Sequence, residues 1–286
     1  MNGFHFADPV SQTLLIPLWA RAVEQREAEP LVVDPVAASM VEQIDFDWRS
    51  IRLTRGDLAQ CVVRLREFDR LVRDFLRRRP EAVVVHIGCG LDARFQRVDD
   101  GRVRWFDLDL PDVIALRRQF LPETERNRYL AVSVFDADWM TLLAGSGRPG
   151  VPTGRSVLFV AEAVLCYFDP DEVKALVIEL RRCFPGSELV TDVFTPLTIR
   201  FDNLHLLLTG ATARLRWGVR DPRELESWAD GIRLEESFSY FDDPEPRTGL
   251  PSWLGRLGFM RRAATIQRYR LGEPRPSESG GSGSES

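Results

Sequence analysis

The stretch Ala82-Val83-Val84-Val85-His86-Ile87-Gly88-Cys89-Gly90-Leu91-Asp92-Ala93 decides the fold. A short run of β-branched residues leads directly into two glycines, which is typical of a buried parallel strand that ends in a tight turn. Glycines at such a turn permit positive φ angles and let a ligand approach the backbone closely. In open α/β sheets, ligands bind beyond the carboxyl ends of the strands. We therefore expect a nucleotide-like ligand at this turn.

Short apolar strands and helical patterns alternate after this turn. Helices are predicted over 113–120 and 171–184, and strands over 103–106, 129–134, 156–160, 188–194, 232–234 and 263–270. Such alternation predicts an α/β fold in which helices cover both faces of a mainly parallel, Rossmann-like sheet.

The segments on either side of this pattern differ from it. Apolar residues recur at helical spacing through residues 10–80, so we expect residues 1–80 to form an N-terminal helical cover. Residues 81–271 would form the core, with a helical insertion over 196–230 that covers the acceptor side and contains Phe201 and Trp217. The Gly/Ser/Glu/Pro-rich stretch 272–286 reads as a disordered tail. Cover and core would make one integrated domain.

Composition excludes several classes of protein. The 286-residue chain carries 38 Lys+Arg against 43 Asp+Glu, a formal charge of -5, which disfavours nucleic acid as a partner. Lys174 is the only lysine, so fixed positive charges in a site must be guanidinium groups. Three histidines and four cysteines without zinc spacing argue against a metal site. No secretion signal or membrane-spanning run is visible, which predicts a cytoplasmic protein, either a monomer or a homodimer.

Acids after the second predicted strand indicate how a ligand would be held. Asp107 and Asp109 lie about 20 residues beyond the first glycine, where a carboxylate can accept hydrogen bonds from both ribose hydroxyls. Two cofactors contain that ribose. Gly88-x-Gly90-x-x-Ala93 satisfies the dinucleotide fingerprint, which predicts an NAD(P)-dependent oxidoreductase. S-adenosylmethionine (SAM) is the alternative, and it has no pyrophosphate.

Three features favour SAM. The glycine motif begins only at residue 88, whereas a dinucleotide domain usually opens its chain. Asp92 puts negative charge where a pyrophosphate would lie, but the same charge suits a sulfonium and an ammonium group. Finally, a further acid, Glu162, ends the fourth predicted strand.

The chain resembles the leucine carboxyl methyltransferase family, especially its bacterial branch of tetracenomycin-type polyketide O-methyltransferases. The resemblance runs from about residue 12 to 270 and rests on motifs that occur in the family's order. These are Trp19-Ala20-Arg21-Ala22, Asp34-Pro35-x-Ala37, Val63-Arg64 with Phe68-Asp69, Ile87-Gly88-Cys89-Gly90-Leu91-Asp92-Ala93-Arg94-Phe95-x-Arg97, Asp107-Leu108-Asp109-Leu110-Pro111-Asp112-Val113, Ser133-Val134-Phe135-Asp136 with Trp139, and Ala161-Glu162-Ala163-Val164-Leu165-x-Tyr167.

The resemblance implies a class I SAM-dependent methyltransferase sheet under a helical cover, and it assigns roles to individual residues. Two departures from the family pattern are Cys89, where alanine is common, and an arginine (Arg117 or Arg118) where many members have lysine. The implied cofactor-binding residues are Gly88, Gly90 and Asp92 at the turn, Asp109 at the ribose, Ser133, Val134 and Asp136 at the adenine, Arg21 and Arg64 near a carboxylate of SAM or of the acceptor, and Glu162 near the sulfonium.

The acceptor follows from the chemistry of methyl transfer. A carboxylate is already ionised at neutral pH and needs no general base, whereas a phenol or alcohol usually does. Because no histidine follows a catalytic pattern, we expect a carboxylate or an acidic phenol of a small secondary metabolite, positioned by Arg64 and Tyr167. A protein C-terminal carboxylate ranks lower, since nothing indicates a large partner surface. A catalytically silent binding module is a third alternative.

Overall fold

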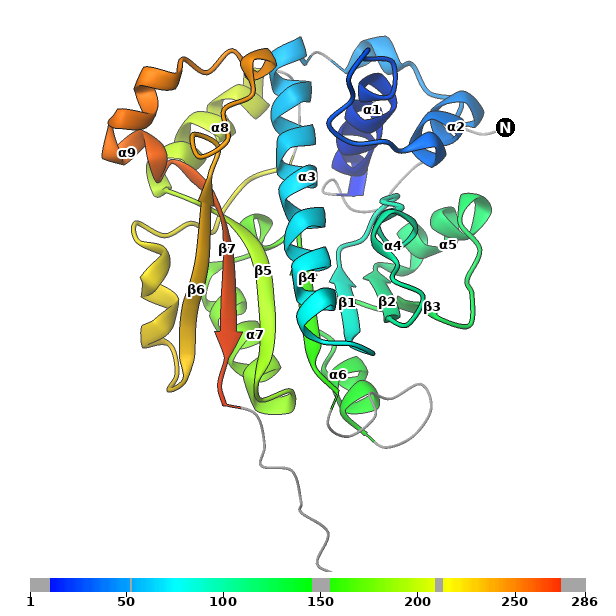
Figure 1. Ribbon diagram of the computed structural model, residues 1–286, viewed down its shortest axis with the longest axis vertical. Coiled ribbons are helices and arrows are strands. Elements are labelled where there is room, and N and C mark those ends of the chain that lie inside the picture. Colours follow the sequence, from blue (N-terminus) through cyan, green and yellow to red (C-terminus); the bar gives the residue numbers. More distant parts are fainter. Residues whose placement is uncertain (1–10, 52, 146–154, 209–212, 274–286) are drawn as a thin grey trace, which may run out of the picture.

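The computed structural model describes residues 11–51, 53–145, 155–208 and 213–273. Seven strands in these residues form one sheet in the order β3-β2-β1-β4-β5-β7-β6 (Figure 1). The strands β1 to β5 run parallel, and β7 is antiparallel to both β5 and β6. Their bounds are β1 Val83–Ile87, β2 Arg104–Asp109, β3 Asn127–Ala131, β4 Val157–Ala161, β5 Ser187–Phe194, β6 Ile232–Ser239 and β7 Ala264–Leu271.

The predicted α/β class is confirmed, and the strand order explains where a ligand can bind. The decisive strand β1 lies at the centre and pairs with β2 on one side and β4 on the other. The chain therefore reverses its direction of winding between β1 and β4, which is the switch point that leaves a crevice beyond the carboxyl ends of the strands.

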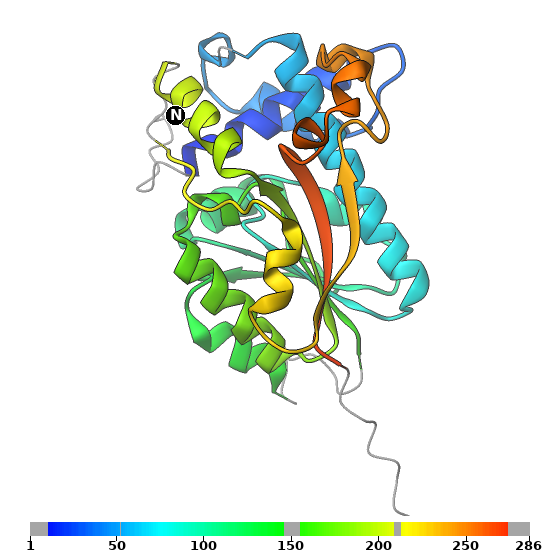
Figure 2. The same cartoon turned by 90° about the vertical axis from the view of Figure 1, so that its left-hand side faces the viewer.

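Helices cover both faces of the sheet (Figure 2). On one face, α3 packs against it, and on the other α6 and α7 do so. The helices are α1 Leu15–Glu24, α2 Pro35–Gln43, α3 Arg55–Arg78, α4 Arg94–Val98, α5 Pro111–Phe120, α6 Ala137–Ala144, α7 Pro170–Cys183, α8 Pro196–Leu208 and α9 Gly258–Arg261, and 3-10 turns include η1 Ser11–Leu14, η3 Leu165–Tyr167 and η4 Pro222–Ser227.

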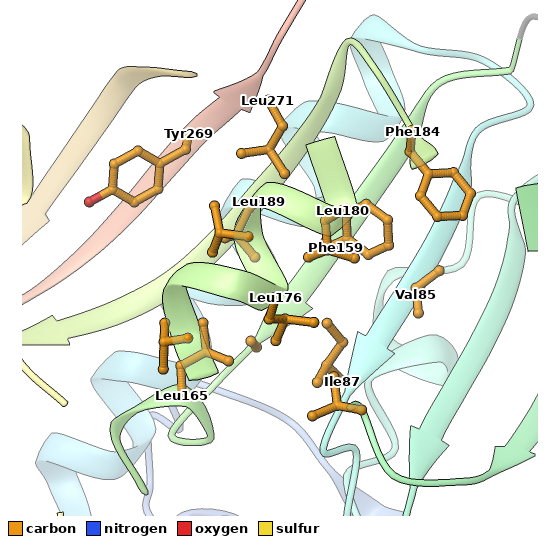
Figure 3. Close-up of a cluster of buried hydrophobic side chains, with 14 of the residues drawn as sticks. Val85, Ile87, Phe159, Leu165, Leu176, Leu180, Phe184, Leu189, Tyr269 and Leu271 are labelled. Carbon is orange, nitrogen blue, oxygen red and sulfur yellow. The ribbon is translucent and has the colours of Figure 1, made fainter. Parts of the chain in front are cut away.

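Alternation along β1 divides the core into two halves. Val83, Val85 and Ile87 point to the α6/α7 side, while Val84 points to α3. Figure 3 shows the α7 side, where Leu176 and Leu180 lie over strand residues such as Phe159 and Leu189. Because every residue of β1 is buried, this strand holds the glycine turn at a fixed position.

The N-terminal helices lie beyond the carboxyl ends of the strands (Figure 1). Leu15 and Leu18 of α1 belong to the same buried cluster as Cys89 and Leu91 of the glycine turn. The long helix α3 begins with a capping box between Thr54 and Asp57 and then runs down over the sheet. Its first turns therefore border the crevice, and its last turns pack on the core.

Several predictions of detail need correction. In the described part of the 196–230 segment, α8 is the only α-helix, and Trp217 is 1% exposed because it packs in the main core. Phe201 on α8 is 64% exposed. The third strand ends at Ala131, before Ser133 and Val134, and the sixth continues to Ser239. Residues 274–286 of the predicted tail lie outside the described residues.

Candidate active site

A cavity of about 380 Å³ opens at the carboxyl ends of β1, β2 and β4, below η1 and α1. This volume lies in the range of small-molecule pockets. Every site residue that the sequence predicts lines it, with the exception of Asp136: Arg21, Arg64, Gly88, Gly90, Asp92, Asp109, Ser133, Val134, Glu162 and Tyr167. The fold thus gathers these residues into one site, while their individual roles stay predictions.

The glycine turn needs its glycines for conformation and for space. Gly88 has φ 63° and Gly90 has φ 50°, values that side chains rarely adopt. A Cβ built on Gly88 would lie 2.4 Å from Cγ2 of Val164, in the loop after β4. The turn therefore lets Val164 approach the backbone of β1 and keeps the cavity floor free of side chains.

Asp109 lies at the end of β2 and borders the cavity. Its carboxylate accepts the N–H of Gly90 at 2.7 Å and the N–H of Leu110 at 2.8 Å. Burial raises the pKa of Asp109, and the two backbone hydrogen bonds oppose that shift. The structure thus places this carboxylate beside the glycine turn in the cavity wall, and its role at a ribose stays a prediction.

The other candidate, Asp107, belongs to the core. Its carboxylate accepts Nη2 of Arg117 at 2.7 Å and Nε1 of Trp105 at 2.8 Å, and Nδ1 of His86 lies 3.4 Å away. Burial opposes ionisation, but Arg117 and His86 together hold the pKa of Asp107 below its ordinary value. Arg117 also donates to the carbonyl of Gly90 at 3.0 Å, so it is the buried arginine that supports the turn.

A buried network of four arginines and four acids surrounds the inner end of the cavity. Because four guanidinium groups face four carboxylates, the formal charge of these buried groups is zero. Their ion pairs are Arg21–Asp34 at 3.0 Å, Arg21–Asp92 at 3.9 Å, Arg97–Asp34 at 2.9 Å, Arg97–Asp92 at 2.8 Å, Arg97–Asp69 at 2.8 Å, Arg94–Asp69 at 2.9 Å, Arg94–Asp92 at 3.2 Å, Arg64–Glu162 at 3.0 Å and a short contact between Arg94 and Glu162; outside them, the exposed side chain of Arg73 lies 3.9 Å from Asp69.

This network changes the interpretation of Asp92. We expected its negative charge to face a sulfonium or ammonium group. Burial would raise the pKa of Asp92, but Arg97, Arg94 and Arg21 hold it well below the ordinary range. Asp92 therefore lines the cavity as a carboxylate that is already compensated by arginines.

Arg64 and Glu162 connect the helical cover to the end of β4. Nε of Arg64, on α3, donates to Oε1 of Glu162 at 3.0 Å. Glu162 is the hydrogen-bond partner that the described residues supply to this guanidinium, whose side chain is 15% exposed. The Nη groups of Arg64 donate no hydrogen bond to the described residues, and Arg64 lines the cavity.

Tyr167 and the histidines complete the chemistry of the site. Burial raises the pKa of Tyr167, against a smaller opposing effect of its hydrogen bond with the Thr13 side chain, so its phenol stays protonated and can donate. His86 lines the cavity but is only 2% exposed. His5 and the side chain of His205 lie outside what the structure describes.

Asp136 does not reach the cavity. It is an exposed N-cap of α6 that accepts the N–H of Asp138 at 3.2 Å. The sequence pattern of an Asp before a helix contained this alternative, because N-cap acids and ligand-binding acids look alike. Adenine would instead contact the loop residues Ser133 and Val134 before it.

Sequence reasoning assigned no role to Arg94, Arg97 or Asp69 in the network, or to Asp192. The partners of the arginines are Asp34 at the N-cap of α2, Asp69 on α3 and Glu162 just after β4, so the spacing in the sequence gives no sign of them. Asp192 did carry a signal, because it is an acid near the carboxyl end of a central strand, like Asp109. It is 2% exposed, and both its carboxylate oxygens accept the N–H of Ala163.

Comparison with known proteins agrees with this geometry. The leucine carboxyl methyltransferase family model matches residues 15–180. The tetracenomycin polyketide synthesis O-methyltransferase TcmP of Streptomyces glaucescens is 34% identical over 91% of this chain and 96% of its own length. The SAM-dependent methyltransferase dpfgK of Gibberella zeae is 30% identical over 88% of this chain and 89% of its own.

Solved structures support the fold alone. A putative methyltransferase from Thermobifida fusca superposes with a TM-score of 0.58 at 16% identity, covering 94% of this chain and 100% of that one. A DUF574 family protein from Streptomyces avermitilis gives a TM-score of 0.55 at 16% identity, covering 89% and 97%. No helix of the described residues is long and apolar enough to cross a membrane.

Proposed function

Because the chain belongs to the leucine carboxyl methyltransferase family and is a SAM-dependent methyltransferase, we propose that it methylates an oxygen of a small secondary metabolite. The acceptor oxygen is a carboxylate or an acidic phenol, and the metabolite is of the polyketide type. Support for the polyketide class comes from the tetracenomycin methyltransferase, to which most of the chain is similar. The family membership sets aside the dinucleotide alternative.

The residues of the cavity fit SAM. Gly88 and Gly90 present backbone without side chains to the cavity, and Asp109 offers a carboxylate that could accept the ribose hydroxyls. Ser133 and Val134 would flank the adenine. When bound, SAM supplies an electrophilic methyl group on a positively charged sulfur. The protein's own task is to align the acceptor oxygen and to exclude water from it.

The class of acceptor is inferred from the hydrogen bonding of Arg64. Its guanidinium uses Nε to bind Glu162 and keeps its outer edge for the cavity. A planar guanidinium edge binds a carboxylate with two parallel hydrogen bonds, and an arginine stays charged at all working pH values. Arg64 would therefore orient a carboxylate of SAM or of the acceptor. The protonated phenol of Tyr167 would donate a hydrogen bond to the acceptor.

Among the described residues, the site offers no strong base to an unactivated alcohol. The imidazole of His86 is buried beside Asp107, and Glu162 is compensated by Arg64 and Arg94. A carboxylate needs no proton removed, and an acidic phenol is partly ionised at neutral pH. This agreement favours an acidic acceptor over an alcohol or an amine.

The test is a methyl-transfer assay with labelled SAM and matched aromatic acceptors that carry a carboxylate, a phenol, or both. A methyl ester releases labelled methanol in mild alkali, whereas a methyl ether does not. We expect alkali-labile product from carboxylates, a loss of at least about 10-fold in kcat/KM in Arg64→Gln, and little change in Arg66→Gln. Arg66 lies on the same helix but binds Asp243. Methylation confined to neutral alcohols or amines would refute the proposal.

A further inference from the structure

Asp192 lies directly behind the turn that carries Glu162. It is near the end of β5, and its neighbour Thr191 is in register with Ala161, the last residue of β4. The Asp192 carboxylate accepts the Ala163 N–H with both oxygens, at 3.0 and 3.1 Å. Asp192 is 2% exposed and forms no ion pair among the described residues, although the positive charge of Arg64 acts on it electrostatically.

This hydrogen bond fixes an unusual backbone conformation. Ala163 has φ 53°, in the left-handed region that non-glycine residues rarely occupy. The residues on either side of it both line the cavity: Glu162 pairs with Arg64, and Val164 lies against Gly88. By binding Ala163, Asp192 therefore determines how these two side chains meet the ligand.

Asp192 also adds a charge that the surrounding network lacks. The four arginines and four acids of the network balance, and Asp192 is an extra negative charge just outside it. SAM carries a fixed positive charge on sulfur, while its product S-adenosylhomocysteine (SAH) is a neutral thioether. A buried charge acts over several ångströms because little solvent screens it.

The groups around Asp192 move its pKa towards neutral pH. Burial raises its pKa to about 6, Arg64 on α3 opposes this, and Glu162 adds to it. Burial raises the pKa values of the neighbouring Cys166, Tyr167 and Tyr240, so these groups stay neutral, and β7 contributes the uncharged Ile266 beside it. On α8, the negative charge of Asp202 contributes to the raised pKa of Cys166.

We propose that Asp192 is a positioning residue that holds the Glu162–Val164 turn and, through its negative charge, raises the affinity of the cavity for the sulfonium cofactor relative to the neutral thioether product. The inference rests on SAM as the cofactor and does not depend on which acceptor is methylated. Its tests therefore measure binding and can fail without affecting the acceptor assay.

The first test is calorimetric titration of the full chain with SAM and with SAH, each between pH 5 and pH 8. For the wild type, we expect the ratio of SAM to SAH affinity to rise about 10-fold as the pH passes through 6, since Asp192 ionises there. SAM binding near pH 6 should also release protons, which SAH binding should not. A ratio independent of pH would overturn the proposal without any variant.

The second test compares Asp192→Asn with Glu188→Gln. Asparagine keeps one acceptor for Ala163 but removes the charge, so SAM affinity at pH 8 should fall about 10-fold and SAH affinity less than about 2-fold. Glu188 is also buried on β5, but it pairs with Arg78 and Arg268 away from the cavity, so its variant should keep the wild-type ratio. Equal losses of SAM and SAH affinity in Asp192→Asn would mean that the residue is only structural.

Discussion

The Asp109 carboxylate accepts the backbone N–H of Gly90 at 2.7 Å. This bond joins the end of β2 to the glycine turn after β1, and Asp109 has no arginine partner within ion-pair distance among the described residues. The neighbouring Asp107 is the reverse case, because Arg117, Trp105 and His86 surround it. Two acids that are two residues apart thus separate into a group that lines the cavity and a group in the core.

Replacing Asp109 with alanine should weaken SAH binding by about 1–3 kcal/mol, because the ribose loses a charged hydrogen-bond acceptor. Calorimetric titration gives the affinity directly. The control is Asp112→Asn, on the first turn of α5, whose carboxylate bonds only the N–H of its neighbour Val113. If affinity is unchanged in Asp109→Ala, then another group holds the ribose.

Replacing Gly88 with alanine should abolish cofactor binding and reduce stability by about 1–3 kcal/mol, because it combines a strained φ with a collision. The new Cβ would lie 2.4 Å from Val164. Gly101→Ala is a matched control, since Gly101 also has a positive φ, 81°, but a Cβ at this position would meet no other atom within 4 Å.

A second alanine separates the two causes. In Gly88→Ala with Val164→Ala the 2.4 Å contact is removed and the nearest remaining atom of residue 164 is its Cβ at 3.3 Å, so part of the lost stability should return in thermal unfolding. The cost of the strained φ remains, as it does in Gly101→Ala. If the double variant is no more stable than Gly88→Ala, then the contact with Val164 is not what requires a glycine at this position.

The sequence predicted most of the fold because its signals were local. Runs such as Val83–Ile87 are β-branched and end at glycines, and these properties determine a buried strand without reference to other residues. Predictions were wrong where the burial of an element depends on distant partners. Trp217 lies in an extended segment that packs against Trp228, which the pattern around residue 217 does not indicate.

The residues that line the cavity were predicted from sequence motifs. The long-range ion pairs behind the cavity were not predicted. Gly88, Asp109 and Glu162 each lie at a strand end, and parallel strands bring their ends to one edge. The partners of Arg97 lie 28 and 63 residues away, so no spacing rule reveals that it links Asp69 and Asp34. Asp136 shows the opposite difficulty, because a helix cap and an adenine contact share one sequence pattern.

Replacing Asp107 with asparagine should destabilise the fold by about 3–5 kcal/mol, because it leaves the buried guanidinium of Arg117 without its carboxylate. Urea unfolding at pH 7 measures this loss. The folded-state pKa of Asp107 is lowered, so its contribution is present above the unfolded value of about 4 and disappears as the pH falls. The difference between variant and wild type should therefore shrink below pH 4, and a constant difference would contradict this account.

Asp192→Asn should have the opposite effect on stability. The folded-state pKa of Asp192 is raised to about 6, above an unfolded value of about 4, so the group stabilises the fold while it is protonated. That contribution is complete below about pH 4 and is lost as the pH rises through 6.

Asparagine cannot ionise, so the variant should gain about 1–3 kcal/mol relative to the wild type between pH 4 and pH 7.5. Urea unfolding at the two pH values measures this change. Parallel profiles for the two proteins would show that Asp192 does not titrate in this range. A gain in stability that accompanies a loss of SAM affinity would instead show that the buried charge is kept for binding although it destabilises the fold.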